Sequence, residues 1–234
     1  MRFTLTCLFA LVMGRGVAQF NGKLVYQIDN NGVRTVMTYI QNGTNAIVEA
    51  YTGTLKNGAL DTTTLHPQDT ILYDFAAGTE THLQFKTGRA YKTSYTTKNK
   101  AAAAMPQPSG QWGLTFTSAA GGTVNGYQCS HYVITNNEPY GTGTKDVWTT
   151  NSFAGSPTLW VVGSFLYFTP GYPHFVKLTA LGASGVVVKV NESYPKQNVG
   201  YSMNLVFADP NYVPSPAGFF NVPSRYTLVD RSNF

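Results

Sequence analysis

Cys129 and His131 form a local pair of residues whose side chains could act together as nucleophile and base. They lie two positions apart in a β-rich run, and such positions share one face of a strand. A thiol nucleophile needs an imidazole within hydrogen-bond reach and a third group that orients the imidazole. A thiol hydrolase built on this pair is therefore one hypothesis. The alternative, which we favour, is a small buried cysteine beside a strand histidine.

The other residues with catalytic or metal-binding chemistry are scattered along the chain. His66, His82 and His174 lie far from one another, and the carboxylates show neither a paired acid and base spacing nor a calcium-loop spacing. Gly-x-Ser-x-Gly, His-Glu-x-x-His and P-loop motifs do not occur. The sequence therefore indicates no catalytic signature, and we expect no metal and no cofactor.

Short β-rich runs, each bounded by Gly, Asn, Asp or Pro, make up most of the chain. An alternating run at residues 24–28 is followed by Asn31 and Gly32, which favour a tight hairpin turn, and by a second run at residues 33–40. Short strands at even spacing, without alternating helices, predict a mainly β fold in which an antiparallel meander closes into a barrel or a curved sheet. Further runs lie at residues 46–51, 70–75, 81–86, 90–96, 114–117, 127–135, 145–149, 186–190, 201–207 and 226–229.

Residues 158–168 break this pattern with an almost uncharged run of apolar and aromatic side chains. Pro157 can begin a helix, and Pro170 and Pro173 must end one, so a short helix over about residues 157–168 is one prediction. A fully buried strand is the other. An exposed cluster of these side chains would exceed the apolar patches of soluble monomers, so the segment is core, lid or interface. The alanine- and proline-rich residues 100–110 are expected to form a surface excursion.

The start of the chain has the layout of a secretory leader. Arg2 is followed by an apolar block and by small residues up to Ala18, which predicts a signal peptide at residues 1–18. This block is too short to span a bilayer, and no later run is long enough. Residues 19–234 would then form a single β-rich domain in the periplasm or in the medium.

Charge and cysteine content narrow the choice of partners. Charged residues make up 12% of the chain, and loss of the leader would lower the net charge of +5 by two. The absence of any long basic run argues against a nucleic-acid partner. Cys7 lies in the predicted leader, so the remaining cysteine, Cys129, has no intramolecular partner and stability must come from burial.

Four strand phrases, at residues 126–134, 146–150, 185–190 and 220–226, together resemble an uncharacterised family of bacterial exported proteins. That family is a domain of unknown function similar to the LolA/LolB lipoprotein-carrier superfamily. The resemblance implies a half-barrel, a curved antiparallel sheet whose concave side is closed by one or two short helices around an apolar cavity. In the carriers this cavity holds acyl chains. No binding residue is carried over, because the matching phrases contain no functional signature.

The expected function is non-enzymatic binding of an apolar or amphiphilic ligand, a lipid or a lipoprotein acyl chain, on the concave side of the sheet. Ligand pockets are mostly apolar with a few polar groups, which suits an aromatic lid at residues 157–175. The alternative is a cell-envelope structural or interaction protein whose apolar segment is core or a homodimer interface, without a ligand. The predicted ligand contacts are Trp160, Phe165, Tyr167, Phe168, Tyr172 and Phe175.

Overall fold

Strands dominate the computed structural model of the protein. It describes residues 20–30, 33–53, 55–56, 59–60, 64, 66–94, 113–138, 141–153, 178, 181–194, 199–215 and 218–231. Within these residues the strands are β1 Gly22–Asn30, β2 Val33–Asn42, β3 Asn45–Gly53, β4 Leu55–Lys56, β5 Ala59–Leu60, β6 His66–Asp74, β7 Thr79–Gln84, β8 Arg89–Ser94, β9 Gly113–Val124, β10 Tyr127–Glu138, β11 Gly141–Thr150, β12 Val186–Tyr194, β13 Val199–Asp209 and β14 Thr227–Asp230.

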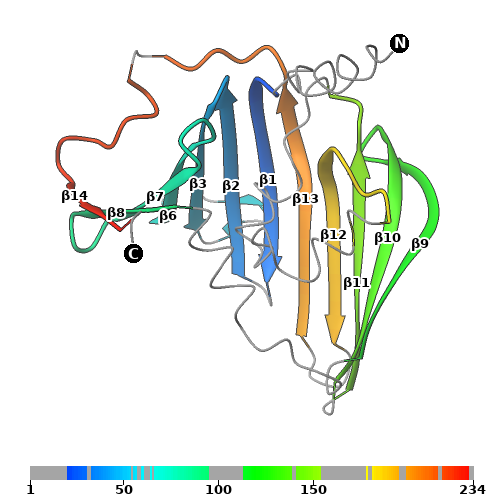
Figure 1. Ribbon diagram of the computed structural model, residues 1–234. Helices are drawn as coiled ribbons and strands as arrows, with labels where there is room; N and C mark the ends of the chain where they lie inside the picture. Colours follow the sequence, from blue (N-terminus) through cyan, green and yellow to red (C-terminus); the bar gives the residue numbers. More distant parts are fainter. Residues whose placement is uncertain are drawn as a thin grey trace, which may run out of the picture.

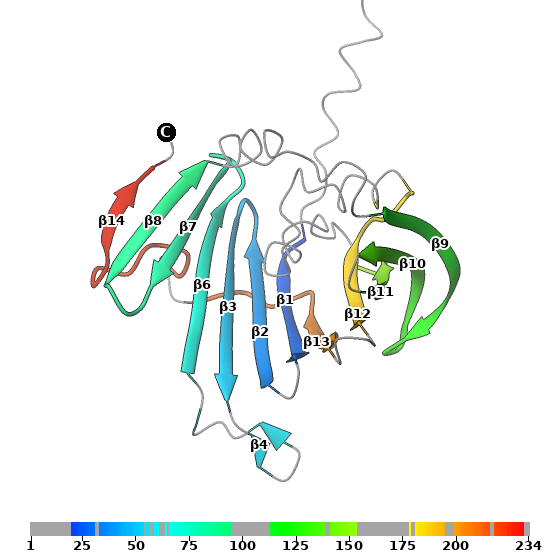
Figure 2. The ribbon, with the colours of Figure 1, turned by 90° about the horizontal axis from the view of Figure 1, so that it is seen from below.

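Twelve of these strands form one sheet in the order β14-β8-β7-β6-β3-β2-β1-β13-β12-β11-β10-β9, and β4 and β5 form a separate hairpin (Figure 1). The chain makes two meanders, β1 to β8 and β9 to β13, which join where β1 pairs with β13. All neighbouring pairs are antiparallel except β14, which runs parallel to β8. Figure 2 shows that the sheet is strongly curved and that its two edge strands do not meet. The prediction of a mainly β, curved antiparallel sheet is confirmed.

The predicted strands are found in the structure, and their alternation decides which side chains are buried. In β1, Leu24, Tyr26 and Ile28 are buried and the intervening side chains are partly exposed. Several predictions concern segments outside the described residues: the leader at 1–18, the turn at 31–32, the excursion at 100–110 and the helix at 157–168. In the part of the chain that the structure describes, no helix has the length and hydropathy of a membrane span.

The sheet has an apolar cluster on each face. The outer cluster consists of Ile40, Ile47, Leu72, Leu83, Ala90 and Tyr226, packed against Phe85, Tyr212, Phe219, Phe220 and Val222. Most of these last side chains come from the segment between β13 and β14. The inner cluster is built on Leu24, Tyr26, Ile28, Met37, Tyr39, Val48, Ile71, Tyr73, Cys129, Tyr132, Ile134, Val147, Val186, Val188, Val190, Met203 and Leu205, with Phe20, Phe153, Leu178 and Ala183 packed among them.

Candidate ligand-binding face

A chain of aromatic contacts crosses the inner face from one meander to the other. Phe20 lies 6.3 Å from Tyr39 of β2 and 6.2 Å from Phe153, measured between ring centroids, and Phe153 lies 5.1 Å from Tyr127 of β10. In the sheet order, β2 and β10 are separated by β1, β13, β12 and β11. Rings can bridge that span only because the sheet bends toward this face, so the inner cluster occupies the concave side.

Some polar groups of this concave face have hydrogen-bond partners among the described residues, and others have none. The Tyr39 hydroxyl donates to Gln41 Oε1, and both side chains are buried. The Tyr26 side chain is 0% exposed, and its hydroxyl has no hydrogen-bond partner among the described residues. Burial, with a smaller contribution from Tyr127, raises the pKa of Tyr26, so this phenol stays protonated and is available as a donor. Tyr26 is therefore an unsatisfied polar group inside an apolar surface.

A second unpartnered hydroxyl lies on the same face, at its polar end. Tyr201 of β13 is in register with Glu192 of β12, and Lys145 Nζ lies 3.0 Å from Glu192 Oε2. The Tyr201 hydroxyl is buried and has no hydrogen-bond partner in the part of the chain that the structure describes. Burial, followed by the charge of Glu192, raises the pKa of Tyr201. One part of the concave face is therefore apolar and contains Tyr26, and the other holds the Lys145–Glu192 ion pair and Tyr201. Each part has one phenol hydroxyl without a partner among the described residues.

Cys129 and His131 do not share a face, which corrects the prediction made from their spacing. The register of β10 against β9 shifts between these two residues, and the inner cluster takes Cys129 and then Tyr132 and Ile134, so His131 lies on the other side of the strand. There it stacks on Trp148 with ring centroids 4.4 Å apart. The Cys129 thiol donates to the Tyr127 carbonyl at 3.3 Å, and burial raises the pKa of this thiol. His131 Nε2 lies 2.8 Å from Asp146 Oδ1. The two residues form no nucleophile and base pair.

Among the described histidines, His82 also has close acidic neighbours. Its Nε2 lies 2.8 Å from Oε1 of the buried Glu80, and its Nδ1 lies 3.9 Å from Asp69 Oδ2. Burial lowers the pKa of His82. Among the described residues, no group of three or more His, Cys, Asp or Glu side chains is placed to hold a metal ion.

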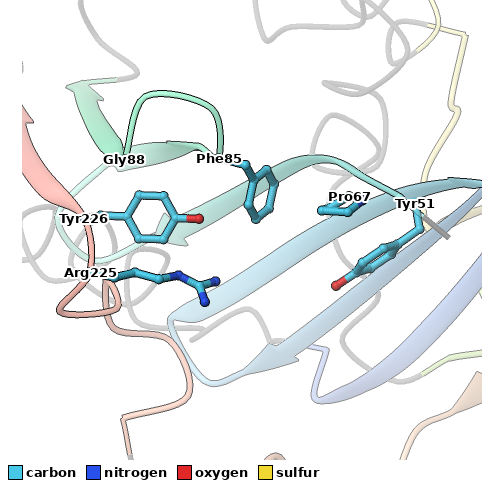
Figure 3. Close-up of a pocket in the computed structure, with 6 residues that line it drawn as sticks. All are labelled: Tyr51, Pro67, Phe85, Gly88, Arg225 and Tyr226. Carbon is cyan, nitrogen blue, oxygen red and sulfur yellow. The ribbon is translucent and has the colours of Figure 1, made fainter.

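Two hollows illustrate the difference between the faces. One, of about 560 Å³, is lined by Tyr51, Pro67, Phe85, Gly88, Arg225 and Tyr226 (Figure 3). The guanidinium carbon of Arg225 lies 5.2 Å from the centre of the Tyr226 ring, and Tyr226 belongs to the outer cluster. This hollow therefore sits where the segment before β14 packs on the outer face.

The other hollow, of about 460 Å³, lies beside β13 and reaches the inner cluster. It is lined by Gln27, Asn125, Tyr127, Asn204, Leu205, Val206 and Phe207. Leu205 is buried in the inner cluster, and Tyr127 packs against that cluster. This hollow is thus in contact with side chains of the concave face.

The side chains predicted to contact a ligand, Trp160, Phe165, Tyr167, Phe168, Tyr172 and Phe175, lie outside the described residues. Sequence reasoning did not single out Tyr26 and Tyr201. The alternation of β1 and of the 201–207 run could have placed both on a buried face. Nothing in the sequence shows that their hydroxyls lack partners, because that depends on which strands become neighbours.

Solved structures that match this chain have very low sequence identity to it. An uncharacterised conserved protein from Thermus thermophilus is 8% identical, with a TM-score of 0.47, and the match covers 97% of this chain and 100% of that one. A putative outer membrane lipoprotein-sorting protein domain from Vibrio parahaemolyticus is 7% identical, with a TM-score of 0.33 and coverage of 90% and 92%. A DUF1329 family protein from Desulfovibrio piger is 9% identical, with a TM-score of 0.23 and coverage of 90% and 93%.

The sequence itself identifies a family. No curated protein matches the chain. The profile of the family described as "Domain of unknown function (DUF4412)" matches residues 20–226, which include all the described strands except β14. The expectation of an uncharacterised domain family is confirmed, and the chain belongs to the DUF4412 family.

Proposed function

We propose that the protein is a non-enzymatic, extracytoplasmic binding protein that takes up an apolar or amphiphilic ligand, a lipid or a lipoprotein acyl chain, on the concave face of its sheet. The observation that carries this proposal is the Tyr26 hydroxyl, which is fully buried in the inner cluster and has no hydrogen-bond partner among the residues that the structure describes. A buried unsatisfied donor costs about 1–3 kcal/mol. A ligand carbonyl that accepts a hydrogen bond from Tyr26 would offset that cost.

The chemistry of the face supports binding rather than catalysis. Ligand sites combine a mostly apolar lining with a few polar groups that orient the ligand. Here the lining is aliphatic and aromatic, and the phenols of Tyr26 and Tyr201 are its unpartnered donors among the described residues. The Cys129 thiol, by contrast, is held by a backbone carbonyl and is turned away from His131. In this proposal Trp160, Phe165, Tyr167, Phe168, Tyr172 and Phe175 supply further apolar contacts to the ligand.

The test has two parts. Native mass spectrometry of the protein purified from its source is expected to show a bound lipid. Titration of the delipidated protein with a dansylated undecanoic acid is expected to show saturable binding, which unlabelled monoacylglycerol displaces.

Variants separate the proposed site from the surface. Trp160→Ala and Phe165→Ala are each expected to weaken probe binding about tenfold, the equivalent of about 1.4 kcal/mol. Leu228→Ala changes a side chain of β14 that is 51% exposed, and this control should bind like the wild type. A monomeric protein without bound lipid and without saturable probe binding would overturn the proposal.

A further inference from the structure

The sheet is split between β12 and β13. These strands pair only from Lys189 with Asn204 to Tyr194 with Val199. Beyond that point β12 continues to pair with β11, and β13 continues to pair with β1. Residues 205–209 of β13 therefore have a strand neighbour on one side only, within the described part of the sheet.

The turn between β9 and β10 lies against this split. Asn125 has a φ of 50° and Gly126 a φ of 84°, which is the left-handed geometry of a tight hairpin turn. The Asn125 side-chain Nδ2 donates to the Leu205 carbonyl at 3.1 Å. A side-chain amide thus takes the place that a strand partner would occupy. One hydrogen bond from a turn is easier to break than a ladder of backbone bonds.

The mouth of the split, where the 460 Å³ hollow opens beside Val206 and Phe207, combines exposed apolar side chains with uncharged polar ones. A bulge where β13 passes Val25 and Tyr26 of β1 inserts an extra residue, and next to it Val206 and Phe207 are 57% and 51% exposed. The 460 Å³ hollow at this point is otherwise lined by carboxamides, from Gln27, Asn125 and Asn204, and by Tyr127 and Leu205. No charged side chain lines it. Such a lining suits an acyl chain with a neutral ester better than a charged headgroup.

The wall of this hollow adjoins the unpartnered phenol. Leu205 lies opposite Tyr26 in the register of β13 with β1, and Tyr127 is close enough to Tyr26 to contribute to its pKa. A chain that passes between Leu205 and the β9–β10 turn would reach the Tyr26 hydroxyl next.

We propose that the split between β12 and β13 is the entrance by which the acyl chain of a neutral acyl ester reaches Tyr26. The proposal rests on the proposed function of the concave face. It identifies the ligand as an uncharged acyl ester, whose carbonyl accepts a hydrogen bond from Tyr26. The carboxamides of Gln27, Asn125 and Asn204 then face the hydroxyls of its glycerol group at the mouth.

Blocking the mouth tests the proposal. Val206→Cys, coupled to a bulky maleimide, is expected to slow uptake of a fluorescent monoacylglycerol at least about tenfold. Leu228→Cys, coupled in the same way, is the matched control, because Leu228 is similarly exposed but lies on β14. Cys129 is buried and its thiol pKa is raised, so the exposed introduced cysteine is labelled in preference to Cys129. Mass spectrometry of the labelled wild type checks this point.

A second variant opens the mouth instead of blocking it. Asn125→Ala removes the hydrogen bond to Leu205 and is expected to raise the uptake rate. If the wild type binds monoacylglycerol and labelled Val206→Cys takes it up as fast as labelled Leu228→Cys, the entrance is wrong and the proposed function stands. If the wild type prefers undecanoate to monoacylglycerol, the assignment of a neutral ester is wrong. If the wild type binds neither undecanoate nor monoacylglycerol, the proposed function itself is wrong.

Discussion

At the scale of single residues, the buried hydroxyl of Tyr26 lowers the stability of the ligand-free protein, and a substitution can measure this effect. Its hydroxyl is buried without a partner, so Tyr26→Phe removes an unsatisfied donor and keeps the ring. We expect the free energy of unfolding of the ligand-free protein to rise by about 1 kcal/mol, measured by urea denaturation. Tyr39→Phe is the control, because the Tyr39 hydroxyl donates to Gln41, and its loss should lower stability. A less stable Tyr26→Phe would mean that the phenol has a partner.

Two residues show why spacing alone did not predict the chemistry of the site. Cys129 and His131 would share a face in a regular strand, but the register shift between them turns His131 toward Trp148 and Asp146. The strand opposite approaches closely there, since a Cβ on Gly121 would collide with the Cys129 carbonyl. The two consecutive glycines at 121 and 122 hint at such a bulge, although they do not fix its position.

At the scale of the elements, the start of β12 depends on a glycine that no other residue can replace without strain. Gly185 has a φ of 82°, and a Cβ there would collide with the Thr150 carbonyl and with Asn151 Oδ1. Gly182 has a φ of 88° but no atom within 4 Å of an added Cβ. Gly182→Ala should therefore cost only the left-handed backbone strain, about 1–2 kcal/mol. Gly185→Ala should cost clearly more in urea denaturation, and equal losses would contradict the close approach.

The strands were predictable from sequence, and their arrangement only in part. Alternation and turn residues located β1 to β3 and most later strands, because each face of a strand is either buried or exposed over several residues. The two-residue strands β4 and β5 are too short to give such a signal. The pairing of β1 with β13 and the split beside Leu205 depend on contacts between distant segments. For the same reason the sequence indicated an apolar site without locating Tyr26 in it.

At the scale of the whole molecule, one sheet has an apolar cluster on each face. The inner cluster joins both meanders across the concave side, whereas the outer cluster depends on the segment that returns from β13 to β14. This segment leads into β14, where Thr227 N donates to the carbonyl of Gly88, the residue before β8, and it is followed by Arg231, whose N donates to the Lys92 carbonyl of β8, both at 2.8 Å. The last described residues thus reinforce the first meander, and the segment that carries them covers part of the outer face.

Tyr226 tests whether this returning segment is part of the cooperative fold. Tyr226 is 9% exposed, and its ring packs edge-on against Phe85 with centroids 6.3 Å apart. Tyr226→Ala is expected to lower the free energy of unfolding by about 3 kcal/mol, as for other large aromatic truncations, within a single urea transition. Val213→Ala, at a position of the same segment that is 76% exposed, should change it by less than about 0.5 kcal/mol. If Tyr226→Ala is as stable as Val213→Ala, the segment is a strap laid over an independently stable sheet. A large decrease in the free energy of unfolding would instead mean that the outer cluster and the concave face unfold together. Destabilising substitutions on the outer face would then also weaken ligand binding.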